Sequence, residues 1–144
     1  MTNAYTELTK KHSTEFNDFP MVFAFSTEQF KEAMEKLGLE VTDTDKIYKG
    51  FGGGFYKRTD SARLKELTGR HTKDMEDAIS ADITGEGFIF EMFDYELSNH
   101  EYCYTYDITD TIDALGLTIE EINGNEALKH GLKLAKIAQR EGDC

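Results

Sequence analysis

Three consecutive glycines flanked by basic residues form the first group whose chemistry the sequence suggests. The segment Gly50-Phe-Gly-Gly-Gly54 allows backbone N–H groups to converge on an anion such as a phosphate or a phosphodiester. It matches neither the Walker pattern, which needs Gly-Lys-Ser/Thr, nor the dinucleotide fingerprint, so a plain hairpin tip is the competing interpretation. The candidate anion-binding residues are Lys49, Gly52, Gly53, Gly54, Lys57 and Arg58.

A second candidate consists of Glu96 and His100, which share one face of a helix if their segment is helical. With His71 as a third ligand, they could hold zinc, manganese or iron, because imidazole and carboxylate groups suit these metals. The sequence contains no His-Glu-x-x-His pattern, and a glutamate–histidine hydrogen bond explains the pair equally well. We therefore predict neither a metal site nor a cofactor, and keep His71, Glu96 and His100 as the metal-binding alternative.

A third candidate is an acidic surface that also carries aromatic side chains. The segment between Lys73 and Lys129 has no lysine or arginine but contains 15 carboxylates. Acids alternate with aromatics in 88–96 and 101–107, where rings would supply contact area and carboxylates would engage a basic partner. An ordinary acidic protein with buried aromatics would show the same pattern. The residues predicted to bind a partner are Asp94, Glu96, Glu101, Asp107, Asp110 and Asp113.

The charge of the whole chain limits the classes of partner. A net charge of −12 offers nucleic-acid phosphates little counterion release, so we expect no direct binding to nucleic acid. Such a charge favours a protein partner with a basic surface, approached through long-range steering. The recurrence of Asp107, Asp110 and Asp113 at every third residue lacks the ligand pattern of a calcium-binding hand, and the first two are expected to favour a helix N-terminus.

The composition predicts one soluble domain. A chain of 144 residues with 39% hydrophobic and 12% aromatic residues can bury a real core. We expect a single domain over 1–144, with a loosely attached N-terminal helix in 1–18 and a frayed tail at 140–144. No apolar run approaches the roughly 18 residues of a membrane helix, and the N-terminus lacks the features of a secretory signal.

The two cysteines agree with a reduced compartment. Cys103 and Cys144 match no zinc pattern and do not suggest a disulfide framework. We expect Cys103 to be a half-buried structural thiol, because the acidic neighbours Glu101 and Asp107 disfavour a reactive thiolate. With no membrane segment and no secretory signal, a cytoplasmic protein is the plain interpretation.

The elements that must position these groups follow from periodicity and capping signals. Ser26-Thr-Glu-Gln29 and Thr118-Ile-Glu-Glu121 are capping boxes, and Gly38 and Gly116 can end helices in the left-handed conformation. Residues 88–101 fit both a strand and a helix, and we assign a helix because β-branched residues are almost absent. Residues 102–106 are expected to be extended. The other predicted helices are 3–16, Ser26 to Leu37, Asp60 or Ser61 to about Ala81 with a kink left open at Gly69, Asp107 or Thr109 to Leu115, and one capped by Asn125.

The predicted fold is therefore α+β, a helix-rich single domain with a small antiparallel sheet. Short apolar or aromatic runs predict strands near 21–25, 46–49 and 55–58, the last two joined by the glycine loop.

Several ordered motifs resemble a family of small uncharacterised acidic proteins from phages and mobile elements of Gram-positive bacteria. The resemblance spans roughly residues 20–135 and implies a host of that kind, without assigning any catalytic residue. The motifs are Phe23-Ala-Phe-Ser26, Glu28-Gln-Phe30, Lys36-Leu-Gly-Leu39, Gly52-Gly-Gly54, Gly85-Glu-Gly-Phe88, Tyr95-Glu-Leu97, Asn99-His-Glu-Tyr102 and Asp110-Thr-Ile-Asp-Ala-Leu-Gly-Leu-Thr118.

These observations lead to one expected function and two alternatives. We expect a non-enzymatic accessory protein of a phage or mobile element that binds a partner protein through the acidic, aromatic-containing surface, as an inhibitor of a nucleic-acid-directed defence or regulatory machine. One alternative is a small enzyme or a phosphate- or nucleotide-binding protein that uses the 50–54 glycine loop with His71, Glu96 or His100. The other is a metal-stabilised structural module. The oligomeric state is left open.

Overall fold

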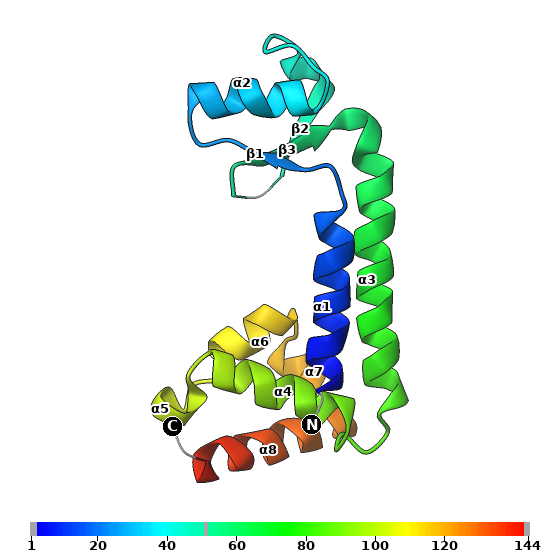
Figure 1. The fold of residues 1–144 in the computed structure, drawn as a ribbon. Coiled ribbons are helices and arrows are strands. Elements are labelled where there is room, and N and C mark those ends of the chain that lie inside the picture. The colour runs from blue at the N-terminus through cyan, green and yellow to red at the C-terminus, as the bar shows by residue number, and fades with distance from the viewer. Residues whose placement is uncertain (1–2, 51, 143–144) are drawn as a thin grey trace. The chain divides into compact units, whose positions relative to one another are not determined.

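The computed structural model describes residues 3–50 and 52–142. It is helix-rich with one small antiparallel sheet, so the predicted α+β class is confirmed (Figure 1). The chain divides into two compact units, one made of residues 11–73 and the other of residues 3–10 with 74–142 among those described. Helices α1 (Ala4–Asn17) and α3 (Ser61–Ala81) contribute residues to both units.

The unit of residues 11–73 contains the whole sheet. Strands β1 (Val22–Phe23), β3 (Gly54–Lys57) and β2 (Ile47–Lys49) are antiparallel and lie in that order. Phe55 of β3 is opposite Val22 on one side and Lys49 on the other, which sets the register of the sheet. The strands predicted near 21–25, 46–49 and 55–58 are thus confirmed. Short 3-10 turns, Thr44–Lys46 and Arg58–Asp60, precede β2 and follow β3.

Helix α2 (Thr27–Lys36) begins and ends at the predicted capping residues. Ser26 Oγ accepts the Gln29 amide hydrogen at 3.2 Å, and the Gln29 side chain accepts the Phe25 N–H at 2.8 Å. Gly38 has a φ of +75°, and the Leu39 N–H returns to the Met34 carbonyl at 2.9 Å. These caps fix the two ends of α2, whose apolar side packs into the small core of this unit. That core consists of Ala33, Met34, Leu37 and Phe55 with partly buried neighbours.

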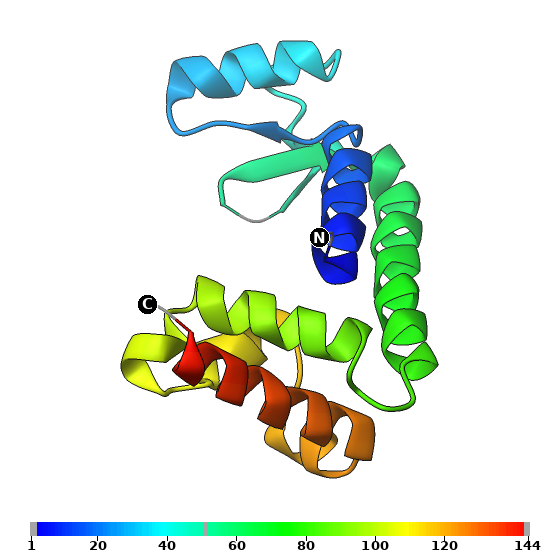
Figure 2. The ribbon, with the colours of Figure 1, turned by 60° about the horizontal axis from the view of Figure 1, so that its bottom comes forward.

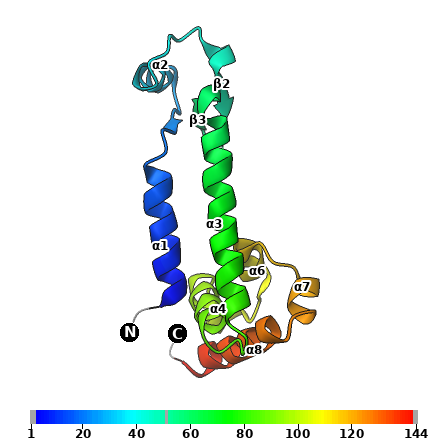
Figure 3. The ribbon, with the colours of Figure 1, turned by 90° about the vertical axis from the view of Figure 1, so that its right-hand side faces the viewer.

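Helices α1 and α3 run alongside each other within this unit (Figure 3). Helix α3 has no fully buried residue, but the predicted apolar stripe containing Leu64, Leu67 and His71 is half-buried. Gly69 lies in open space on the exposed side, and the helix continues through it without a break. The kink left open at this glycine therefore does not occur.

The other unit is built on α4 (Phe88–Asn99) and α8 (Glu126–Glu141), which lie side by side (Figure 2). The helical interpretation of residues 88–101 is confirmed over α4, because its apolar residues meet α8 instead of a neighbouring strand. A Cβ atom at Gly131 of α8 would lie 2.5 Å from Ile89 Cγ2 and 2.6 Å from the Gly85 carbonyl oxygen, so glycine allows the close approach. The core of this unit contains Tyr5, Ile89, Met92, Phe93, Leu97, Tyr102, Ile112, Ile122, Leu128, Leu132 and Ala135.

Three short helices connect α4 to α8: α5 (Tyr102–Thr105), α6 (Thr109–Leu115) and α7 (Ile119–Asn123). The expectation that residues 102–106 are extended is wrong, because Tyr102 packs inside the core of this unit and the chain turns through α5. Glu101 and Tyr106, on either side of α5, have φ values of 58° and 56° in the left-handed region. These two residues reverse the chain direction without glycine.

Most caps of the later helices agree with the sequence. The exception is the start of α6, where the N-cap residue is Ile108 without a side-chain cap, so neither Asp107 nor Thr109 is the cap, although Asp107 Oδ1 accepts the Thr109 N–H at 2.9 Å. Gly116 ends α6 with a φ of +66°. Thr118 Oγ1 accepts the Glu121 N–H at 3.1 Å, and Asn125 Oδ1 accepts the Leu128 N–H at 3.1 Å. The tail predicted to fray, 140–144, includes 143–144, which lie outside the described residues, and α8 itself extends to Glu141.

Among the helices of residues 3–50 and 52–142, none combines the length and the hydropathy that crossing a bilayer requires.

Candidate functional site

The six carboxylates predicted to bind a partner fall into two groups. Asp94 is half-buried, and its carboxylate accepts a hydrogen bond of 2.8 Å from Gln139 Nε2 on α8. Glu96 is buried, with 7% of its surface exposed. The remaining four, Glu101, Asp107, Asp110 and Asp113, are exposed on the segment that includes α5 and α6. These four are the exposed members of the predicted set.

Two exposed tyrosines accompany the exposed carboxylates. Tyr104 and Tyr106 have 68% and 62% of their surface exposed. Tyr102 is buried, and its ring packs edge-on against the Tyr106 ring at a centroid distance of 5.7 Å. The left-handed conformations at Glu101 and Tyr106 set the directions in which the chain enters and leaves α5. We define the acidic–aromatic face as Glu101, Tyr104, Tyr106, Asp107, Asp110 and Asp113.

Local hydrogen bonds stabilise the ionised form of Asp107 in this face. The Thr109 hydroxyl donates to Asp107 at 2.7 Å, and the Thr109 backbone N–H donates at 2.9 Å. The hydrogen bond from the Thr109 hydroxyl has the larger effect on the Asp107 carboxyl, and the bond from the Thr109 backbone N–H adds to it. Together they outweigh partial desolvation and hold the pKa of Asp107 below its ordinary value. Asp107 therefore remains ionised at neutral pH and contributes a full negative charge to the face.

Glu96 and His100, the predicted pair, meet at the end of α4. His100 Nε2 lies 3.4 Å from Glu96 Oε2, an ion-pair distance longer than a good hydrogen bond. The Tyr5 hydroxyl of α1 also donates a hydrogen bond to Glu96. Burial is the main cause that raises the pKa of Tyr5, and the negative charge of Glu96 is the second. Sequence reasoning missed Tyr5 because no spacing signal links residues 91 positions apart. The cluster joins the start of α1 to α4 in the same unit.

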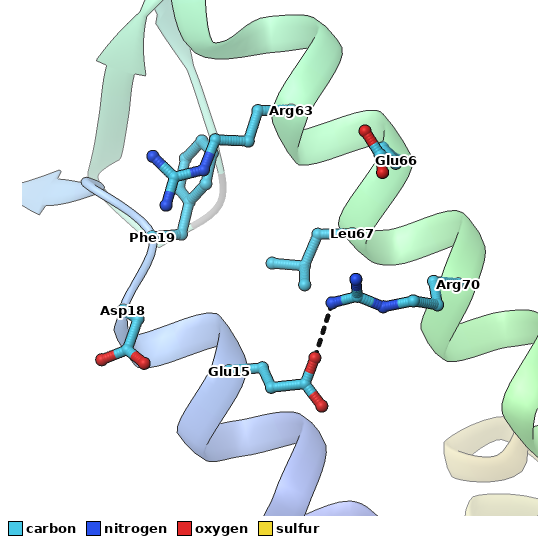
Figure 4. Close-up of a pocket in the computed structure, with 7 residues that line it drawn as sticks. All are labelled: Glu15, Asp18, Phe19, Arg63, Glu66, Leu67 and Arg70. Carbon is cyan, nitrogen blue, oxygen red and sulfur yellow. Dashed lines mark hydrogen bonds and ion pairs between the residues drawn. The ribbon is translucent and has the colours of Figure 1, made fainter.

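His71, the third metal candidate, belongs to a separate cluster in the unit of residues 11–73. Its Nε2 lies 3.6 Å from Glu15 Oε2, and its ring stacks on that of His12 at 3.9 Å. The Arg70 guanidinium donates to the same Glu15 oxygen at 2.6 Å (Figure 4). Desolvation acts to raise the pKa of the Glu15 carboxyl, but Arg70 and His71 outweigh it and lower the net value. Glu15 is therefore an ionised partner of the Arg70 guanidinium, beside the His71 imidazole, and a poor general acid.

A pocket of about 340 Å³ lies beside this cluster, between the end of α1 and α3 (Figure 4). Its lining mixes acids and bases, and the Arg63 guanidinium lies 5.7 Å from the centre of the Phe19 ring. The Glu15–Arg70 ion pair occupies one side, and Leu67 forms the middle of the floor in Figure 4. The Glu15–Arg70 ion pair links α1 to α3 at this pocket.

The metal candidates lie in two different units of the structure. Glu96 and His100 belong to one unit and His71 to the other, and each imidazole faces its own carboxylate. Among residues 3–50 and 52–142, no group of three or more histidine, cysteine, aspartate or glutamate side chains is arranged to hold a metal ion.

The glycine loop borders a pocket of about 300 Å³ beside the sheet. Lys49, Gly53 and Gly54 of the predicted anion-binding set line this pocket, whereas Gly52 and Lys57 do not. Its other walls are mostly apolar, formed by Ala24, Phe30, Ile47 and Phe55 with Gly50.

Arg58, the last member of that set, is engaged elsewhere. It stacks over the Tyr48 ring at 4.6 Å, and its Nε donates to the Ile47 carbonyl at 3.2 Å. The pocket beside the glycine loop could therefore accept an apolar body with one anionic group near Lys49, while Lys57 and Arg58 are not among its lining residues.

Cys103 differs from its expected state. It is half-buried on α5 and disulfide-bonded, so the expectation of a structural thiol is wrong. The other cysteine of the sequence, Cys144, lies outside the described residues. A bonded sulfur is not a nucleophile, which removes cysteine chemistry at Cys103.

The chain matches a known protein family. No curated protein and no solved structure matches the chain. A family model does match residues 4–138, which include every element from α1 to most of α8. On this match, the protein belongs to the family of unknown function DUF7659.

Proposed function

We propose that this protein is a non-enzymatic accessory protein that binds a partner protein with a basic surface through the acidic–aromatic face. The observation that carries the proposal is the exposure of Tyr104 and Tyr106 among four exposed carboxylates in a segment without lysine or arginine. Exposed tyrosines supply contact area with few rotatable bonds, and the carboxylates steer a basic surface towards it.

The arrangement of the remaining groups supports binding over catalysis. The buried carboxylate Glu96 is occupied by Tyr5 and His100, and Glu15 is occupied by Arg70 and His71. Glu96 and Glu15 therefore already have structural partners within their units. We further propose, on the motif resemblance described above, that the protein comes from a phage or mobile element and acts in the host cytoplasm on a nucleic-acid-directed defence or regulatory machine.

The proposal is tested with a matched pair of charge reversals. Asp110→Lys with Asp113→Lys changes the acidic–aromatic face, and Glu76→Lys with Glu120→Lys changes the net charge equally at other exposed positions. Each variant is used to capture proteins from host lysate, and the association rate with the captured partner is measured at rising salt. We expect capture and fast association to be lost for the first variant only.

A partner that binds both variants equally, or an association rate independent of salt, would contradict the proposal. Screening acts beyond about 8 Å at physiological ionic strength, so a steered association must slow as salt is added.

A second candidate function is supported by the pocket beside the glycine loop, which Lys49 and three glycines line. This pocket would bind a small amphipathic anion. Titration with inorganic phosphate and with a nucleoside monophosphate, followed by amide shifts of Gly53 and Gly54, tests it. Saturable shifts that disappear in Lys49→Ala support the candidate, and absent shifts with both probes exclude these two ligands.

A further inference from the structure

Helix α8 carries a stripe of four bases that the acidic composition conceals. Lys129, Lys133, Lys136 and Arg140 are the only lysines and arginines after Lys73 in the whole sequence. Their spacings of four, three and four residues place them along one side of the helix. The first and last are 11 residues apart, which corresponds to about 16 Å along the helix axis.

These bases line one groove of about 460 Å³ together with apolar residues. Ile108, Ile119, Ile122 and Leu132 form its apolar part, and 46% of the surface of Ile119 is exposed. Glu126 is the only carboxylate in the lining, so the groove has the opposite sign to the rest of the protein. We call this site the basic groove.

The four cationic groups have no acidic partner in the part of the chain that the structure describes. None of them takes part in an ion pair there, and the Arg140 Nε donates to the Lys136 carbonyl oxygen at 3.4 Å. In a chain with 28 acids and 16 bases, four adjacent unpaired cations are not explained by the stability of the fold. Their charge is available to a ligand.

We propose that the basic groove binds an acidic amphipathic helix of a partner protein. A single small anion would engage one or two bases, whereas the stripe extends over three helical turns. A helix with carboxylates at the same spacing would meet all four bases, and its apolar side chains would cover Ile119 and the adjoining isoleucines. A nucleic-acid strand has no aliphatic side chains for this apolar part, and the net charge of −12 opposes a dense polyanion.

This inference is independent of the acidic–aromatic face. That face would take a basic surface, whereas the basic groove takes an acidic one, so the same unit would present two surfaces of opposite preference. Reversal of Asp110 and Asp113 is therefore expected to leave binding at the groove intact.

The test uses three labelled synthetic helices of equal length in fluorescence anisotropy. The first has one stripe of glutamate and one of leucine, the second has glutamine in place of glutamate, and the third has serine in place of leucine. We expect the glutamate–leucine helix to bind at least tenfold more tightly than either control, with an affinity that falls as salt rises.

Variants then locate the binding site. Lys129→Glu with Lys133→Glu should reduce affinity for the glutamate–leucine helix at least tenfold, and Ile119→Ser should also reduce it. Lys31→Glu with Lys65→Glu, a matched reversal of exposed lysines in the unit of residues 11–73, should leave it unchanged. The circular dichroism and melting temperature of each variant show whether it is folded.

Three outcomes overturn the proposal. They are equal binding of the three helices, equal binding by the two lysine double variants, and tighter binding of a single-stranded oligonucleotide or of phosphatidylglycerol vesicles through the same lysines.

Discussion

The imidazole Nε2 of His100 lies 3.4 Å from the carboxylate Oε2 of Glu96, one helical turn earlier on α4. The two partners differ in burial, because 9% of the Glu96 side chain and 28% of the His100 side chain are exposed. Glu96 also accepts a hydrogen bond from the hydroxyl of Tyr5 on α1. Glu96 is therefore the centre of a three-residue cluster in which the histidine is the outer member.

The first prediction follows from this asymmetry. Glu96→Ala leaves the buried Tyr5 hydroxyl without its acceptor, and we expect it to lower the free energy of unfolding by about 1–3 kcal/mol. His100→Ala should cost at most about 1 kcal/mol, because this side chain is partly solvated. Urea unfolding of both variants measures the difference, with Glu86→Ala as an exposed control. A larger loss for His100→Ala than for Glu96→Ala would contradict this assignment.

The second prediction concerns metal removal. Since Glu96, His100 and His71 each have a side-chain partner within the protein, we expect a chelator to leave the melting temperature unchanged. Any ion that bound only the folded state would stabilise it by RT ln(1 + [L]/Kd), so its removal would be visible. A fall of several degrees that one added divalent metal reverses would instead favour the metal-binding alternative.

The third prediction is a loss of stability at alkaline pH. Burial and the Glu96 carboxylate raise the pKa of Tyr5 above its ordinary value of 10.0. Below pH 10 the Tyr5 hydroxyl keeps its proton in both the folded and the unfolded protein, so its contribution to stability is fully present. Above it the unfolded chain loses the proton while the folded protein retains it, and stability falls by up to about 1.4 kcal/mol per pH unit. Melting temperatures between pH 9 and 12 should therefore fall less steeply for Tyr5→Phe than for the wild type.

The fourth prediction compares two helical glycines. Gly131→Ala would place a Cβ atom 2.6 Å from the Gly85 backbone oxygen, and we expect it to destabilise the protein by about 1–3 kcal/mol through overpacking. Gly69→Ala lies in open space within α3 and should stabilise by about 1 kcal/mol, because alanine has the better helix propensity. Thermal unfolding of the two variants checks both signs. Equal effects would show that the α4–α8 contact is looser than described.

Local interactions are what the sequence determined by itself. Ser26, Thr118 and Asn125 cap their helices as expected, and Gly38 and Gly116 end theirs with positive φ. Each of these features involves residues within about four positions, so its energy depends little on the rest of the chain. The helices other than α5, the three strands and the α+β class follow from the same short-range patterns.

The tertiary structure decided which charged and aromatic side chains are available. Asp94 and Glu96 have the same acidic character in the sequence as Asp110 and Asp113, but Gln139 and Tyr5 engage them from 45 and 91 positions away. The helical form of residues 102–105 likewise depends on the burial of Tyr102 in a core contributed by distant helices. Such contacts arise only when separate segments pack together, because burial and long-range pairing leave no periodic signal in one segment.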